Sequence, residues 1–258
     1  MLRGLLATPY RLSKPLIDPQ RVIRGIPLYL GYFKDLLEYR RLGGSASVTL
    51  KDLNPHIYQK GSSHGFDAHY LYQAAWAFRL ILASKTEHHV DVASEAKFVA
   101  MLSAVVETTF IDIRPLAVDL DNFHSKAGSI LDLPYPDASI DSLSCLHAIE
   151  HIGLGRYGDP IDPAGTLKAA KELARVVAPG GNLYVSLPIG KPRVCFNAHR
   201  VHSTAEVLEM FDGLELVEFS SVSDQREFVR GSDLDGFASA KYACGLFWFR
   251  VPAGSNAG

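Results

Sequence analysis

The segment 128–160 constrains the fold most, because it joins a short apolar run to a polar segment that is spaced by glycines. The run 140–146 follows the turn-forming sequence Pro-Tyr-Pro-Asp-Ala-Ser, which is typical of a buried parallel strand. The ionisable or polar side chains directly after it are Glu150, His151, Arg156, Tyr157 and Asp159. Ligands of open α/β sheets bind at the carboxyl ends of strands, so this segment predicts a binding site there.

Strand and helix patterns alternate on both sides of this segment and predict an α/β sheet. The expected strands are residues 89–92, 110–113, 127–132, 140–146, 182–188, 214–221 and 242–251. The expected helices are residues 64–84 and 95–105, a helix opened by Asp162 as N-cap and Pro163, and a helix from Ser203 to Phe211 with a capping box at Ser203 and Glu206. The buried face of the third helix is expected at Leu167, Ala170, Leu173 and Val177.

Three pieces of the chain resemble the class I S-adenosylmethionine-dependent methyltransferases: LPYPDASID from Leu133, Glu150-His151, and VAPGGNLYVS from Val177. The longer strings IEHIGLGRYGDP and LPIGKPRVCFNAHRVHS resemble a narrower methyltransferase-like group, which is known as a domain of unknown function. The resemblance covers roughly residues 88–251. It implies a Rossmann-like fold with a mostly parallel seven-stranded sheet and an antiparallel last strand.

The resemblance implies S-adenosyl-L-methionine as cofactor, bound at the predicted strand ends. Asp112 follows Asp91 by 112 − 91 = 21 residues, the spacing at which nucleotide-binding folds place a carboxylate for ribose hydroxyls. The residues expected to bind the cofactor are Asp91, Ala93, Ser94, Asp112, Ser129, Ile130 and His147.

The first loop departs from the resembled family, which has glycines where this chain has Ala93, Glu95 and Lys97. Glycine lets the backbone pass close to the cofactor, whereas a Cβ obstructs that approach. This departure favours an alternative function, a non-catalytic scaffold or partner module with the same fold.

Transfer of a methyl group to a hydroxyl is assisted by a general base, and histidine titrates near neutral pH. The candidate catalytic residues are His151, His199, His202 and Asp159. Each histidine is equally consistent with a hydrogen-bonded structural role. Cys195 lies close in sequence to His199 and His202, but the chain has no CxxC and no HExxH motif, so no metal is expected.

Several cations near the same predicted strand ends favour a small-molecule or glycan acceptor that bears a carboxylate or phosphate. The candidate acceptor-binding residues are Arg156, Tyr157, Lys191, Arg193, Asn197 and Arg200. The alternative is a solvated loop whose charges pair with Asp159 and Glu150. We expect His151, Arg156, Asn197 and His199 to converge on one pocket that opens towards Ala93. The settings in which the narrower group tends to occur suggest surface polysaccharide biosynthesis, with a sugar hydroxyl as the methyl acceptor.

Residues 1–47 are expected to form a basic helical extension before a methyltransferase-like domain of residues 48–258, with a hinge at Gly43-Gly44. Residues 1–43 carry a charge of 8 − 3 = +5, whereas the whole chain carries −2. Gly25, Pro27 and Gly31 are expected to interrupt any single long helix. The extension either lies on an anionic membrane as a peripheral anchor or forms a short helix pair that packs on the main domain.

The bulk composition excludes other classes of protein. A net charge of −2 argues against nucleic-acid binding through bulk charge, and the oligomeric state is left open. Three cysteines do not form a disulfide framework, so we expect a reducing compartment such as the cytoplasm. No apolar run approaches the ~18 residues of a spanning helix, and the first residues do not predict a signal peptide.

Overall fold

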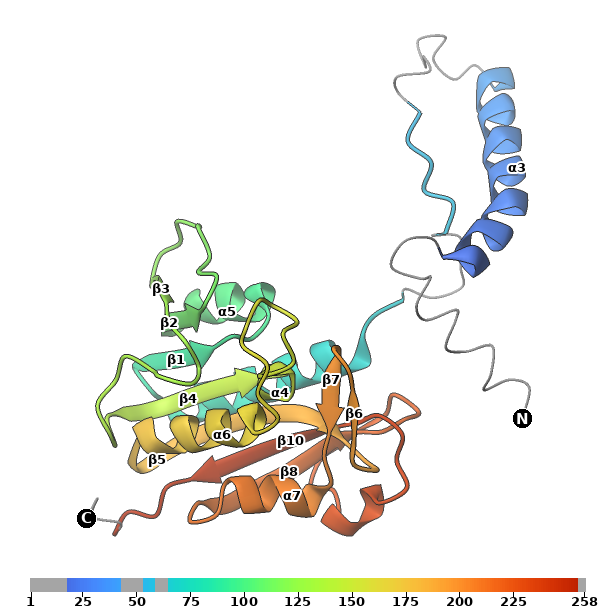
Figure 1. The fold of residues 1–258 in the computed structure, drawn as a ribbon. Helices are drawn as coiled ribbons and strands as arrows, with labels where there is room; N and C mark the ends of the chain where they lie inside the picture. Colours follow the sequence, from blue (N-terminus) through green and yellow to red (C-terminus); the bar gives the residue numbers. More distant parts are fainter. Residues whose placement is uncertain (1–17, 43–52, 59–64, 255–258) are drawn as a thin grey trace. The chain divides into compact units, whose positions relative to one another are not determined.

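The computed structural model describes residues 18–42, 53–58 and 65–254. The chain divides into two compact units, Met1–Gly65 and Phe66–Gly258, drawn in Figure 1. The expected boundary at residues 47–48 and the expected hinge at Gly43-Gly44 lie outside the described residues.

In the described residues of the first unit, Pro19–Arg41 form a single helix, α3, where the sequence predicts an interrupted pair. Asp18 caps its first turn by accepting a hydrogen bond from the Arg21 backbone N–H at 3.2 Å, and Pro27 lies inside the helix. A packed neighbour outweighs the low helix propensity of glycine here. Gly25 is buried against Tyr58, whose hydroxyl donates to the Arg21 carbonyl at 2.5 Å.

The second unit is built on an eight-stranded sheet in the order β3-β2-β1-β4-β5-β10-β8-β9. The strands are β1 (His88–Val92), β2 (Glu107–Asp112), β3 (Phe123–Ala127), β4 (Ile140–Leu146), β5 (Val177–Ile189), β8 (Glu215–Val222), β9 (Phe228–Val229) and β10 (Ala243–Arg250). Strands β1 to β5 pair in parallel, and β10 is antiparallel to both β5 and β8. This order confirms the predicted Rossmann-like fold, to which the two-residue β9 adds an eighth strand.

Helices cover both faces of the sheet (Figure 1). They are α4 (Ala68–Ser84), α5 (Ala96–Ser103), α6 (Gly165–Val176) and α7 (Thr204–Met210), with short 3-10 turns η2 (Ile149–His151) and η3 (Leu234–Phe237). Trp76 of α4 and Phe98 of α5 belong to one hydrophobic cluster, and Leu173 of α6 and Val207 of α7 belong to the other. The sheet therefore has a core on each face.

Several predicted boundaries are wrong. The third strand ends at Ala127, where residues 127–132 were expected to form it. Helix α6 begins at Gly165, because the Asp162 carboxylate bonds the nearby Ala164 N–H and caps a turn before the helix. Leu167 is predicted to be on the buried face of this helix, but its side chain is 40% exposed.

Other local predictions hold. The capping box of α7 is present, since Ser203 and Glu206 each bond the other's backbone N–H. The segment after β5 folds as a hairpin of β6 (Arg193–Cys195) and β7 (His199–Val201). No helix among the described residues is long and apolar enough to cross a membrane.

Candidate active site

A cavity of about 300 Å³ lies at the carboxyl ends of β1, β2 and β4, within the size range of small-molecule sites. The predicted site residues that line it are Ala93, Asp112, Ser129, Ile130, His147, His151, Tyr157 and Asp159. Its position is where an open α/β sheet binds ligands.

Asp112 is the last residue of β2, and its side chain is 15% exposed. One carboxylate oxygen accepts from the Arg114 backbone N–H at 2.7 Å. Ser129 uses its hydroxyl to accept from the Leu131 N–H at 3.1 Å, which holds the turn after β3. Ile130 is buried and gives the same wall an apolar surface. Asp112 is therefore a carboxylate on the wall of an otherwise largely apolar cavity.

Asp91 and Ser94 were expected to bind the cofactor, but they do not line the cavity. The Asp91 carboxylate is fully buried and accepts from the Ser94 hydroxyl at 2.6 Å, its N–H at 3.1 Å, and the Ser144 hydroxyl. Burial raises the pKa of Asp91 to about 6 against the effect of these hydrogen bonds. Ser94 also accepts from the Leu146 N–H at 2.9 Å. These residues fix the first loop against β4.

The first loop leaves the cavity open. Ala93 has a φ of 59°, in the left-handed region where glycine is usual, and its N–H donates to the Ile111 carbonyl at 2.9 Å. Glu95 and Lys97 are not among the residues that line the cavity. Of the three positions that lack the family's glycine, Ala93 alone faces the ligand space.

Glu150 is fully buried beside two histidines. Its Oε1 lies 2.7 Å from His147 Nδ1 and 3.6 Å from His151 Nε2. Burial opposes protonation of His147, but Cys244 and Glu150 raise its pKa to about 10. Burial raises the pKa of Glu150, yet the interaction with His147 brings it below its ordinary value. The two side chains therefore form a buried ion pair.

His151 lines the cavity and differs from His147 in protonation. Its Nδ1 lies 2.6 Å from the Ala198 carbonyl, so Nδ1–H donates there and Nε2 carries the lone pair of the neutral ring. Burial lowers the pKa of His151, and the opposing effect of Glu150 does not restore it. Arg156 also donates to the Ala198 carbonyl, at 2.9 Å. An unprotonated Nε2 at neutral pH is what a general base requires.

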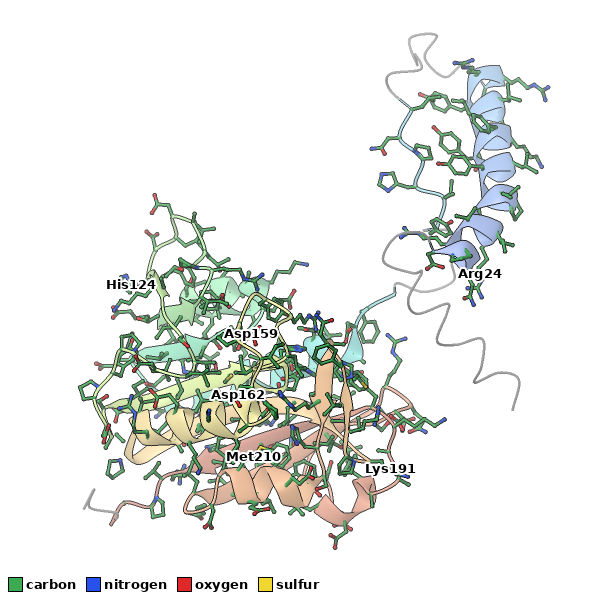
Figure 2. All side chains as sticks on the ribbon, viewed as in Figure 1. Arg24, His124, Asp159, Asp162, Lys191 and Met210 are labelled. Atoms are coloured by element: carbon green, nitrogen blue, oxygen red, sulfur yellow. The ribbon has the colours of Figure 1, made fainter. Side chains whose placement is uncertain are left out.

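Asp159 and Arg200, which the sequence predicts to act on substrate, form hydrogen bonds with the backbone of the loop between β4 and α6. The Asp159 carboxylate accepts from the backbone N–H groups of Gly153, Gly155 and Tyr157 at 2.7, 3.3 and 3.2 Å. Partial burial raises the pKa of Asp159, but these bonds lower it overall. Figure 2 labels Asp159 in this loop.

Arg200 is buried, and its guanidinium donates to the carbonyls of Ile152 at 2.5 Å and Asp162 at 3.0 Å and to the Thr166 hydroxyl at 3.1 Å. These bonds use both of its terminal nitrogens to join β7 to the loop. A side chain held in this way positions the cavity wall and is not placed to clamp an acceptor.

The remaining predicted residues do not line the cavity: Arg156, His199, His202, Lys191, Arg193 and Asn197. The His199 ring lies 4.8 Å from the Tyr242 ring, and His202 Nδ1 lies 3.4 Å from a Glu206 oxygen. Of the four side chains expected to converge, His151 alone lines the cavity. Arg156 contacts the same Ala198 carbonyl as His151 but does not line the cavity, and neither do His199 and Asn197.

A stack of rings beside His147 was not predicted. The His69 and Tyr70 rings each lie 5.4 Å from the His147 ring, and Tyr242 lies 5.1 Å from His69. No local sequence motif surrounds His69. Only the fold brings α4 to the end of β4.

Comparison with known proteins agrees with this geometry. Residues 121–242 match a family described as Caenorhabditis protein of unknown function, DUF268. A proposed sarcosine dimethylglycine methyltransferase from Galdieria sulphuraria is 18% identical, with a TM-score of 0.52 over 71% of this chain and 86% of that chain. N-methyltransferase NodS from Bradyrhizobium japonicum WM9, in complex with S-adenosyl-L-homocysteine, is 18% identical, with a TM-score of 0.51 over 77% and 93%.

This chain has the class I methyltransferase fold. A comparison with curated proteins finds no match. In this fold the cavity at the ends of β1, β2 and β4 lies on the edge of the sheet that carries ligands.

Proposed function

We propose that this protein is an S-adenosylmethionine-dependent methyltransferase that acts on a hydroxyl group of an anionic small molecule or glycan. The observation that supports this most is the cavity at the carboxyl ends of β1, β2 and β4, which has Asp112 on one wall and an unprotonated His151 on another. S-adenosylmethionine, when bound, supplies a methyl group to an attacking nucleophile.

The residues of the cavity fit an adenosyl group. The Asp112 carboxylate can accept hydrogen bonds from two vicinal hydroxyls, as a ribose requires. Ile113, Ile130 and Leu131 give the same region apolar walls that suit a flat base. The backbone at Ala93 reaches the cavity in the left-handed conformation, so the chain turns there as a glycine loop does.

His151 is our candidate for the general base. Its Nδ1–H is anchored on the Ala198 carbonyl, which orients Nε2 as the proton acceptor. A proton taken from the acceptor hydroxyl would reside on Nε2, and the Glu150 carboxylate 3.6 Å away would stabilise the resulting imidazolium. Glu150 is therefore a positioning residue for the base.

Two guanidinium groups beside the cavity support an anionic acceptor. Arg114 and Arg156 lie over the Tyr157 ring, at 4.5 and 5.1 Å from its centroid. Arg156 also donates to the Ala198 carbonyl, and Arg114 Nε lies 3.8 Å from an Asp112 oxygen. The N–H groups that remain suit a carboxylate or phosphate. A sugar that carries such a group would fit a role in surface polysaccharide biosynthesis.

The second candidate function is a non-catalytic scaffold of the same fold. The first loop favours the scaffold function, because Ala93 has a Cβ at a position where the resembled family has glycine. The two candidates differ in whether the cavity binds the cofactor.

Calorimetric titration of the full chain with S-adenosylhomocysteine separates them. We expect binding, and we expect Asp112→Ala to weaken it by about 1.5–3 kcal/mol, the range for a hydrogen bond to a charged group. Asp119→Ala is the matched control, because Asp119 is exposed and lies outside the cavity lining. Absence of binding in the wild type would favour the scaffold, and unchanged affinity in Asp112→Ala would remove the ribose assignment.

We further propose that α3 binds an anionic membrane surface. Ile23, Ile26, Leu30, Phe33 and Leu37 follow one another at helical spacing and are each 48% exposed or more. The same helix carries basic residues at Arg21, Arg24, Lys34, Arg40 and Arg41. Apolar side chains on one face with cations around them suit insertion at the headgroup level of anionic lipid.

Vesicle sedimentation of the full chain tests this proposal. We expect binding to vesicles that contain phosphatidylserine and much weaker binding to neutral vesicles, and we expect Ile26→Asn with Phe33→Asn to abolish it. Met101→Asn with Val105→Asn is the control, since both residues are exposed on the other unit. If the α3 variant instead converts a dimer to a monomer without lipid, a second copy covers this face and the membrane proposal is wrong.

A further inference from the structure

Three potential metal ligands from distant parts of the second unit lie together beside the cavity. They are His69 in the first turn of α4, His147 directly after β4, and Cys244 in β10. One ligand atom of each lies within 4.8 Å of the other two. His147 and Cys244 are buried, and His69 is half-buried.

The orientation of His147 points to a ligand in this cluster. Its Nδ1 is held by Glu150 at 2.7 Å, which leaves Nε2 directed away from that carboxylate. His147 is 7% exposed, and among the described residues its Nε2 has no hydrogen bond of normal geometry, its neighbour in the cluster being the Cys244 sulfur. A buried ring nitrogen in this state is costly unless something binds it. Metal-binding histidines commonly have the other ring nitrogen fixed by a carboxylate, as here.

The chemistry of the three donors selects the class of ion. Imidazole nitrogen and thiolate sulfur suit zinc and other late first-row transition metals, whereas magnesium and calcium require oxygen ligands. A site with three protein ligands also leaves one position of a tetrahedral ion for water or another ligand.

We propose that His69, His147 and Cys244 bind one zinc-like transition-metal ion, with Glu150 holding His147 as its outer carboxylate. Metal bonds of about 2.0–2.3 Å require the three donors to move closer together than they are now. Binding also replaces the Nε2 proton of His147 and the thiol proton of Cys244, which are released to solvent. The ion would join α4, the end of β4 and β10, and binding to the folded state alone raises its stability. The site is independent of the cofactor proposal, because none of its tests requires a methyl donor.

Cobalt titration of the chelator-treated full chain tests the donor set. We expect one equivalent of Co²⁺ to bind with a thiolate charge-transfer absorption in the near ultraviolet, and zinc to displace it. Cys244→Ser should remove that absorption, whereas Cys195→Ser, the matched control at a partly exposed cysteine, should retain it. We also expect zinc to raise the melting temperature of the wild type, and Cys244→Ser to lose this rise.

Two further variants test the geometry without removing the sulfur. His69→Gln should weaken zinc binding at least tenfold, and its position at the half-buried start of α4 makes it the variant most able to fold. Glu150→Gln should weaken binding by about 10- to 100-fold, as expected of an outer partner. Zinc affinity unchanged in a folded His69→Gln variant would overturn the proposal. Loss of the absorption in Cys195→Ser, or no one-equivalent binding by the wild type, would do so as well.

Discussion

The ligand cavity and the buried histidine cluster share His147, but their polar groups have different surroundings. Asp112 on the cavity wall is 15% exposed, and one of its oxygens lies 3.8 Å from Nε of the exposed Arg114 side chain. Glu150 in the cluster is fully buried, and its neighbours are His147 and His151. A carboxylate on a cavity wall, with an exposed partner, contributes mainly to ligand binding, whereas removal of one partner of a buried ion pair lowers stability. Substitution of Asp112 should therefore weaken ligand binding more than it lowers stability, and substitution of Glu150 should lower stability more.

The largest effect on stability is expected from Glu150→Ala. The substitution leaves His147 buried without its partner, which typically costs about 3–5 kcal/mol when a buried pair is broken. Urea unfolding of the two variants Glu150→Ala and Asp112→Ala gives the comparison, and Asp112→Ala should lose less than about 1 kcal/mol. Similar losses of unfolding free energy in both variants would contradict the inference that Glu150 stabilises the fold more than Asp112 does.

The next effect concerns His151, which lies between the two regions. His151→Ala should lower methyl transfer to a hydroxyl acceptor by about 10²-fold or more, the contribution of a positioned base, with little change in S-adenosylhomocysteine affinity. His124→Ala is the control, because His124 is an exposed histidine on β3.

The pH profile of the same reaction adds a second measurement. Burial lowers the pKa of His151, so the base is unprotonated at neutral pH and becomes protonated only as the pH falls. The rate should therefore be constant near pH 7 and decline at a pH below the ordinary value of about 6.5. An acidic limb above that value would contradict the assignment of the base.

The same division between the two regions explains what could be predicted from the sequence. Strand β4 and the capping box of α7 were predicted because their signals lie within a few neighbouring residues. Asp112 was placed at a strand end for the same reason. Local patterns do not show whether a polar side chain points into the core or into the cavity. Asp91 turned inward, because Ser144, a partner 144 − 91 = 53 residues away, occupies its carboxylate.

The histidine cluster could not be predicted in this way. His69 and His147 are 147 − 69 = 78 residues apart, and Cys244 follows His147 by 244 − 147 = 97 residues. No spacing rule joins such residues, because the sheet order and the packing of α4 bring them together. The cysteine and histidines that are close in sequence, Cys195, His199 and His202, are not the ones that meet.

The smallest expected effect on stability comes from a substitution in the first loop, where Ala93 lines the cavity in a left-handed backbone conformation. Ala93 has a φ of 59°, and a residue with a Cβ in this region is strained by roughly 1–2 kcal/mol. Ala93→Gly removes the strain but adds freedom to the unfolded chain, which costs about 0.4–1 kcal/mol. The net result should be a gain of about 0.5–1 kcal/mol in the free energy of unfolding.

Ala138→Gly is the matched control for Ala93→Gly, since Ala138 has a φ of 53° and lies outside the cavity lining. Both variants should gain similar stability in urea unfolding, because both relieve the same backbone strain. Only Ala93→Gly should tighten S-adenosylhomocysteine binding, because only there does the deleted Cβ face the ligand space. If Ala93→Gly weakens binding instead, the methyl group of Ala93 contacts the ligand, and the loss of glycine from this loop is an adaptation of the site and not a sign of its decay.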